Sequence, residues 1–303
     1  MQVSLLYNGN DKRRIIMIRT ITIAAIFALS ACNKTISDPA AQYTDAIEAF
    51  GQADYIEAIK LLEPIADEDH MEAQFLLADI YITGKLGAID NDAGVNWLTR
   101  AAKNGHVRAA SMMGVRYFNG DGVEIDHEKA ATYLKAAAVA KNTKAQLLMG
   151  FLHFHGKGVE QDDNIAARYY YAAALNDEAD AVDRLLKLSE RGSAEALTYA
   201  GLLYKDGIGV GTNAPKAAQL VLGGAQKNFG LAQYMISHAY GSGQGFEQDY
   251  LQAHMWANLA AANGHEGADK RRDVWSQLMT PEQIAQAQDM ARDWTEKFEA
   301  EQE

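Results

Sequence analysis

Cysteine and proline are scarce in this 303-residue chain, which has one cysteine and four prolines. A single cysteine excludes a framework of intramolecular disulfides and any zinc or iron–sulfur site built from several thiolates. Positive charge is also in short supply, because 28 Lys and Arg face 40 Asp and Glu, for a formal net charge of −12. An acidic surface repels phosphate backbones, so no nucleic-acid partner is expected.

A short apolar run lies near the N-terminus, behind Arg19. Residues 21–29 read ITIAAIFAL, which is too short to span a membrane and has the length of a signal-peptide core. The next residues complete the tetrapeptide L-S-A-C, which ends at Cys32 and resembles the lipobox of bacterial lipoproteins. In that motif cleavage precedes the cysteine and the thiol is lipidated. The alternative is a buried free cysteine behind an ordinary signal peptide.

The lipobox resemblance sets the expected layout of the N-terminus. We expect a signal peptide over residues 1–31 and a lipid-anchored tether over residues 32–41. Met17 is a second candidate start, which would make residues 1–16 an upstream artefact. Asn33 replaces the aspartate that favours inner-membrane retention in such lipoproteins, which favours the outer membrane. The expected location is the cell envelope, facing the periplasm.

A 36-residue repeat governs the rest of the chain. Ala73, Ala109 and Ala145 are 36 residues apart, as are Ala196 and Ala232. Each opens the pattern A-x-x-x-[apolar]-[small]-x-x-Y-x-x-G, with histidine in place of tyrosine in the third copy. If the opening alanine is counted as position 0, the alanine and the residues at positions 4, 5 and 8 share one helical face. The pattern therefore predicts an amphipathic helix. The small residue lets a neighbouring helix approach closely.

Signals for a turn and a second helix follow in each copy. A glycine comes after the tyrosine, where it can take the left-handed conformation that ends a helix. An Asp or Asn follows and is expected to cap the second helix. A single hairpin cannot bury its apolar face alone, so the copies must stack into a solenoid. The five expected caps are Asp90, Asp126, Asp162, Asn213 and Asp249.

The whole pattern, A-x-x-x-L-G-x-x-Y-x-x-G-x-G-V-x-x-D-x-x-K-A-x-x-W, closely resembles the Sel-one-like repeat (SLR), a relative of the tetratricopeptide repeat. The resemblance covers five repeats over residues 73–267, and Gly122, Val123, Asp126, Lys129 and Ala130 belong to the best copy. It implies an all-α fold, an α-solenoid in which antiparallel helix pairs form a right-handed superhelix.

The ends of the solenoid and one insertion depart from the repeat. Residues 42–70 look like a tetratricopeptide-type hairpin that would cap the N-terminus. The step from Ala145 to Ala196 is 51 residues, so 15 are added near residues 177–193, where we expect the superhelix to change course. Residues 268–303 are expected to form C-terminal capping helices, because residues 280–283 read T-P-E-Q, a capping box with proline at the first helical position.

Signatures of catalysis and of metal binding are missing. The sequence has no H-E-x-x-H, no G-x-S-x-G and no P-loop. His70, His106 and His265 share one repeat position, but packed helices lie about 8–10 Å apart, too far for one zinc ion to bind them all. We therefore predict no enzymatic activity, no cofactor and no metal site.

The resemblance to tetratricopeptide-type solenoids also implies a binding surface. In such solenoids the first helix of each hairpin lines the concave wall. Aromatic residues beside cations are typical of interface anchors, although the phenylalanines could instead pack against neighbouring first helices. The positions carried over by register are Phe75, Arg108, Phe118, Lys144, Phe151, Phe154, His155, Lys205 and Tyr234.

These features predict a non-catalytic scaffold or regulator at the bacterial cell envelope. It would bind a peptide or protein segment on its concave face and the membrane through a lipid on Cys32, because proteins resembling this family typically mediate the assembly of complexes. One alternative is a surface-exposed factor that binds a host. Another is an enzyme acting on the cell wall or on β-lactams, but the relatives linked to that chemistry carry paired cysteines in each repeat.

Overall fold

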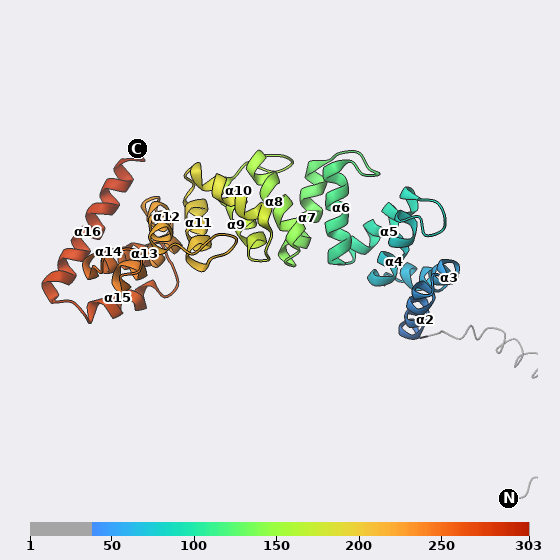
Figure 1. The fold of residues 1–303 in the computed structure, drawn as a ribbon, viewed down its shortest axis with the longest axis horizontal. Helices are drawn as coiled ribbons and strands as arrows, with labels where there is room; N and C mark the ends of the chain where they lie inside the picture. The colour runs from blue at the N-terminus through green and yellow to red at the C-terminus, as the bar shows by residue number, and fades with distance from the viewer. Residues whose placement is uncertain (1–37, 303) are drawn as a thin grey trace, which may run out of the picture.

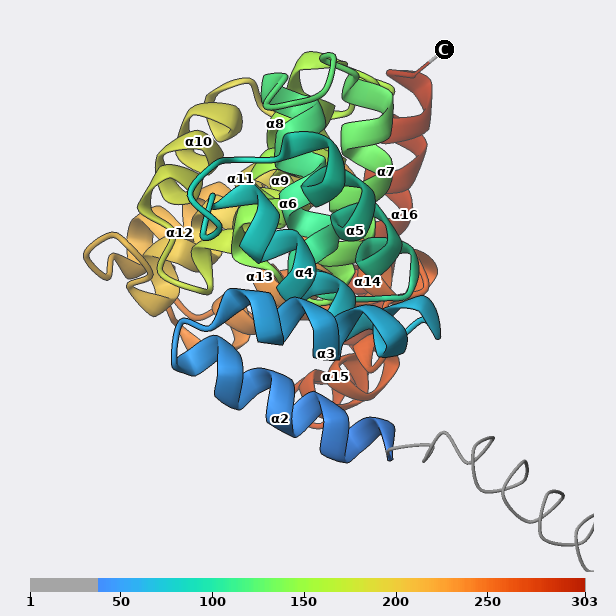
Figure 2. The same cartoon turned by 90° about the vertical axis from the view of Figure 1, so that its right-hand side faces the viewer.

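The computed structural model describes residues 38–302, which form fifteen α-helices and no β-strand. Figure 1 shows the helices following one another along an elongated array, with α2 near one end and α16 at the other. Seen end-on in Figure 2, successive hairpins lie one behind the next. The fold is an all-α solenoid, as the sequence predicted.

Each repeat is a helical hairpin with a first and a second helix. The first helices are α4 (Met71–Ile82), α6 (Val107–Asn119), α8 (Thr143–His155), α11 (Ala194–Asp206) and α13 (Gly230–Ser242). The second helices are α5 (Asn91–Lys103), α7 (His127–Val139), α9 (Asp163–Ala174), α12 (Ala214–Gln226) and α14 (Tyr250–Ala262).

The predicted caps of the second helices are confirmed. Each of the five Asp or Asn side chains accepts a hydrogen bond from the backbone N–H of the third helical residue, at 2.9–3.0 Å. Close packing at the small position is also confirmed: a Cβ added at Gly150 would lie 2.6 Å from the ring of Tyr170, which is buried. Local signals and packing therefore agree in fixing each hairpin.

The histidines that share a repeat position join neighbouring hairpins. His70 and His106 cap α4 and α6, because their Nδ1 atoms accept the backbone N–H of the third helical residue at 3.2 and 3.1 Å. The ring of His106 stacks on Phe75, with 4.1 Å between ring centroids, and His265 stacks on Tyr234 at 4.3 Å. Within residues 38–302, no group of three His, Cys, Asp or Glu residues could hold a metal ion.

The added residues form an extra helix, α10 (Ala179–Glu190). It packs against both α9 and α11, which also contact each other. Val182, Leu185 and Leu188 are buried in the core that these helices share. Val182 also packs on the turn after α11, where a Cβ added at Gly209 would lie 2.6 Å from its Cγ2. The change of superhelical course expected here stays a prediction.

The N-terminal hairpin consists of α2 (Pro39–Gly51) and α3 (Tyr55–Asp67). Asp38 caps α2 by accepting the N–H of Ala40 at 3.2 Å, and Pro39 is the first helical residue. The helix thus begins before residue 42, within the segment expected as a tether. The expected signal peptide, Cys32 and residues 33–37 lie outside the described residues. None of the described helices has the length and hydrophobicity needed to cross a lipid bilayer.

The C-terminal end is formed by α15 (Ala268–Ser276) and α16 (Pro281–Ala300). The predicted capping box is confirmed: Thr280 Oγ1 accepts the N–H of Gln283 at 3.3 Å, and Gln283 Oε1 accepts the N–H of Thr280 at 2.9 Å. Trp294 packs edge-on against the buried Trp256, with 5.7 Å between ring centroids. This contact attaches α16 to α14.

Candidate binding surface

All nine predicted binding residues lie on the first helices, from α4 to α13, and none of them is buried. The cations Arg108, Lys144 and Lys205 are exposed, as is His155, and the five aromatic side chains are half-buried. Successive first helices therefore place accessible aromatic and cationic side chains along one part of the solenoid, which we call the first-helix face.

Four of these residues form a cluster, which we call the central aromatic cluster: Phe118, Phe151, Phe154 and His155. Phe118 and Phe151 meet edge-on across α6 and α8, with 5.4 Å between ring centroids. His155 lies 4.3 Å from Phe151 and 4.7 Å from Phe154. Phe154 also packs against the core shared by α9, α10 and α11. The phenylalanines thus pack between helices, as the alternative interpretation held, and all three residues stay partly exposed.

Three cations that the repeat register did not identify surround this cluster. Lys157 Nζ and the guanidinium of Arg184 lie 5.5 and 5.7 Å from the Phe151 ring centroid, and the guanidinium of Arg191 lies 4.9 Å from that of Phe154. Partial burial lowers the pKa of His155, and these three cations lower it further. The aromatic cluster therefore lies in a positive field, although the whole chain is acidic.

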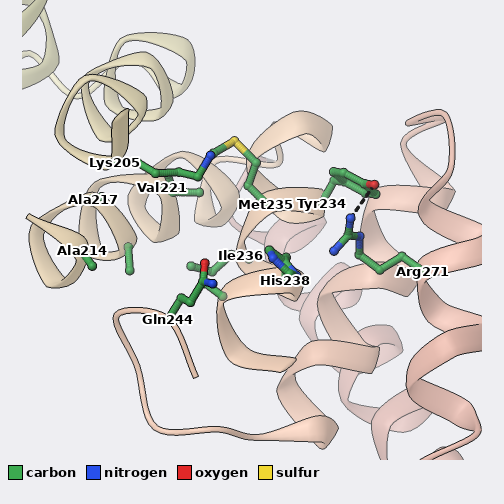
Figure 3. Close-up of a pocket in the computed structure, with 12 residues that line it drawn as sticks. Lys205, Ala214, Ala217, Val221, Tyr234, Met235, Ile236, His238, Gln244 and Arg271 are labelled. Atoms are coloured by element: carbon green, nitrogen blue, oxygen red, sulfur yellow. Dashed lines mark hydrogen bonds between the residues drawn. The ribbon is translucent and has the colours of Figure 1, made fainter. Parts of the chain in front are cut away.

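A pocket of about 230 Å³ opens further along the solenoid, between α11, α12, α13 and α15 (Figure 3). Two predicted residues, Lys205 and Tyr234, are among its twelve lining residues. Aliphatic side chains line it from α12 and α13, and none of the twelve residues is a carboxylate. The polar residues are Lys205, Tyr234, His238, Gln244 and Arg271.

Arg271 reaches this pocket from the C-terminal helix α15. Its Nη2 donates a hydrogen bond of 2.6 Å to the Tyr234 hydroxyl, which Figure 3 shows as a dashed line, and its guanidinium lies 4.1 Å from the ring centroid. Burial lowers the pKa of His238, and Arg271 and Lys205 lower it further. The pocket can therefore enclose an apolar side chain and favour a negative charge beside it.

Sequence reasoning missed Arg271 because it lies in a capping helix, outside the columns of the repeat. Arg184 and Arg191 were missed for a similar reason, since they belong to the insertion and to the turn after it. Lys157 lies in the turn after α8, one residue past the glycine column. A search for isolated cations flanking the first helices could have found Lys157, but no repeat-based signal identifies the other three.

Comparisons with known proteins agree with the repeat structure. The family described as "Sel1 repeat" matches residues 40–70, 72–106, 107–138, 143–178, 194–221 and 230–265. The match includes the N-terminal hairpin, which we expected to be of the tetratricopeptide type, and leaves α10 out. The search of curated proteins gives no match.

Two solved structures illustrate the similarity. One is a protective antigen of uropathogenic Escherichia coli with an SLR fold: it is 25% identical over 79% of this chain, with a TM-score of 0.38, and this chain spans only 56% of its length. The other is a Sel1 repeat protein from Oxalobacter formigenes, 26% identical over 83% of this chain and 99% of its own, with a TM-score of 0.41. On the evidence of its six matched repeats, the chain belongs to the Sel1 repeat family.

Proposed function

We propose that this protein is a lipid-anchored scaffold or regulator of the bacterial cell envelope, which binds a segment of a partner protein along its first-helix face. Sel1-repeat proteins generally serve as protein–protein interaction scaffolds, and their fold is generally non-catalytic. One observation carries the choice of surface: each first helix from α4 to α13 has at least one accessible aromatic or cationic residue among the nine, and two of the nine line the pocket.

Site-specific photocrosslinking in living cells tests the surface without perturbing the core. A benzophenone amino acid replaces His155 or Lys205, both exposed on the first-helix face, or Lys135 or Gln219, exposed on second helices. The same partner should crosslink from both first-helix positions and from neither second-helix position. If the adducts form equally from Lys135 and Gln219, the partner does not bind this face.

The membrane anchor has a separate test in the substitution Cys32→Ala. A lipid chain adds about 0.8 kcal/mol of membrane affinity for each buried CH₂, so its loss should move the protein from the membrane fraction to the soluble fraction. Cell fractionation with immunoblotting measures the shift. Retention of the Cys32→Ala variant in membranes would contradict the anchor, and digestion by protease added to intact cells would favour the surface-exposed, host-binding alternative.

A further inference from the structure

Several cations lie beside aromatic rings of the first-helix face, although the chain has a net charge of −12. Around the central aromatic cluster, Arg191 pairs with Asp163 at 3.0 Å, whereas within residues 38–302 Lys157 and Arg184 have no carboxylate within ion-pair distance. Asp180 and Asp183 border the hollow beside Phe154 but pair with neither cation. Unpaired cations beside aromatic rings favour an anionic partner.

The pocket between α11, α12, α13 and α15 also combines cations with an aromatic ring, and it has an apolar interior. Lys205 and Arg271 lie at it, and no carboxylate is among its lining residues. Among the residues that the structure describes, the Arg271 side chain hydrogen-bonds only the neutral Tyr234 hydroxyl. Lys205 Nζ lies 3.4 Å from Oδ1 of the exposed Asp206. Its volume of about 230 Å³ exceeds the roughly 150 Å³ of an apolar cavity that takes up benzene. A bulky apolar side chain therefore fits.

The central aromatic cluster includes residues of α8, and the pocket includes residues of α11 and α13, with α9 and α10 between α8 and α11 in the chain. A small anion would occupy one region only, whereas an extended chain can reach both. Resting on the proposed function, we infer that the partner segment is acidic and places a bulky apolar side chain in the pocket between α11, α12, α13 and α15. The cations provide the attraction and the pocket provides the anchor.

Selection from a library of short random peptides displayed on phage tests this partner chemistry. The full chain in detergent is the target, and the enriched peptides should contain Asp or Glu with an apolar residue, and few Lys or Arg. Fluorescence polarisation with one labelled peptide then gives Kd. We expect Kd to rise at least about tenfold with Lys205→Glu, and similarly when the peptide's apolar residue is replaced by serine.

A charge-matched control isolates the site from the change in net charge. Lys135→Glu alters an exposed residue of α7 away from the pocket and should leave Kd unchanged. Displacement of the peptide by palmitate would assign the pocket to a lipid and overturn the inference. Enrichment of basic or neutral peptides that photocrosslink from Lys205 would also overturn it, but the proposed binding face would stand. Peptides that bind the Lys205→Glu variant as tightly as the unchanged protein, and that form no crosslink with a benzophenone amino acid at position 205, would overturn both the inference and the proposed binding face.

Discussion

Replacing Gly158 by alanine is expected to destabilise the solenoid by about 2–5 kcal/mol, combining backbone strain with overpacking. Gly158 lies in the turn after α8 and has a φ of +67°, a left-handed conformation that costs an alanine about 1–2 kcal/mol. Its missing Cβ also leaves room for the N-terminus of α7. An added Cβ would overlap the carbonyl group of His127 and lie 2.5 Å from the backbone nitrogen of Glu128. Backbone atoms cannot rotate away, so the two hairpins would have to separate.

A second glycine separates the two contributions. Gly87 has a φ of +97°, but a Cβ added there meets no atom within 4 Å. Gly87→Ala should therefore show only the strain of about 1–2 kcal/mol. Urea unfolding followed by circular dichroism measures both variants, and the midpoint of the first transition is compared because repeat arrays need not unfold in one step. Equal midpoints for Gly158→Ala and Gly87→Ala would show that the turn does not hold α7 against α8.

The helices and their caps could be predicted because their signals are local. A cap such as Asp126 needs only its own helix, and the close approach at Gly150 needs only the hairpin that contains it. The contact of Gly158 with His127 joins two repeats, and the pattern of one repeat contains no information about it. The same limit applies to α10. The spacing of the repeats shows that about 15 residues are added there, but the position of the helix depends on its packing against α9 and α11.

The candidate surface was predicted in part for the same reason. All nine residues chosen by register are accessible, although other positions that the same register assigns to this face, such as Leu147 and Thr198, are buried. Gly241 of α13 is buried because Trp275 of α15, a helix outside the repeats, packs on it. Side chains from non-repeated elements, Arg184 from α10 and Arg271 from α15, complete the two regions that carry positive charge. Their positions follow from tertiary packing rather than from the repeat.

Trp275 lies on the capping helix α15 and packs against α13, which lines the pocket. We expect Trp275→Ala to destabilise this end of the solenoid by about 3–5 kcal/mol. Trp275 is 9% exposed, and its Nε1 donates a 2.9 Å hydrogen bond to the buried Ser237 Oγ. Its ring fits against Gly241, where an added Cβ would lie 2.5 Å from Cη2. Removing the ring leaves a cavity and takes from α15 a buried contact with α13, so that the hydrogen bond of Arg271 to Tyr234 is left to join the two helices.

Loss of this contact should be local, because a solenoid opens from its ends while distant hairpins remain folded. Hydrogen exchange measured by mass spectrometry should show faster exchange of α15 in Trp275→Ala and unchanged exchange of α4 to α9. Trp275→Phe keeps most of the ring but loses the bond to Ser237, so it should cost only about 1 kcal/mol and preserve protection of α15. Because Arg271 lies one turn before Trp275, release of α15 also removes Arg271 from Tyr234 and opens the pocket. Retained protection of α15 in Trp275→Ala would show that its packing against α14 is enough to hold the cap, and that the pocket does not depend on this side chain.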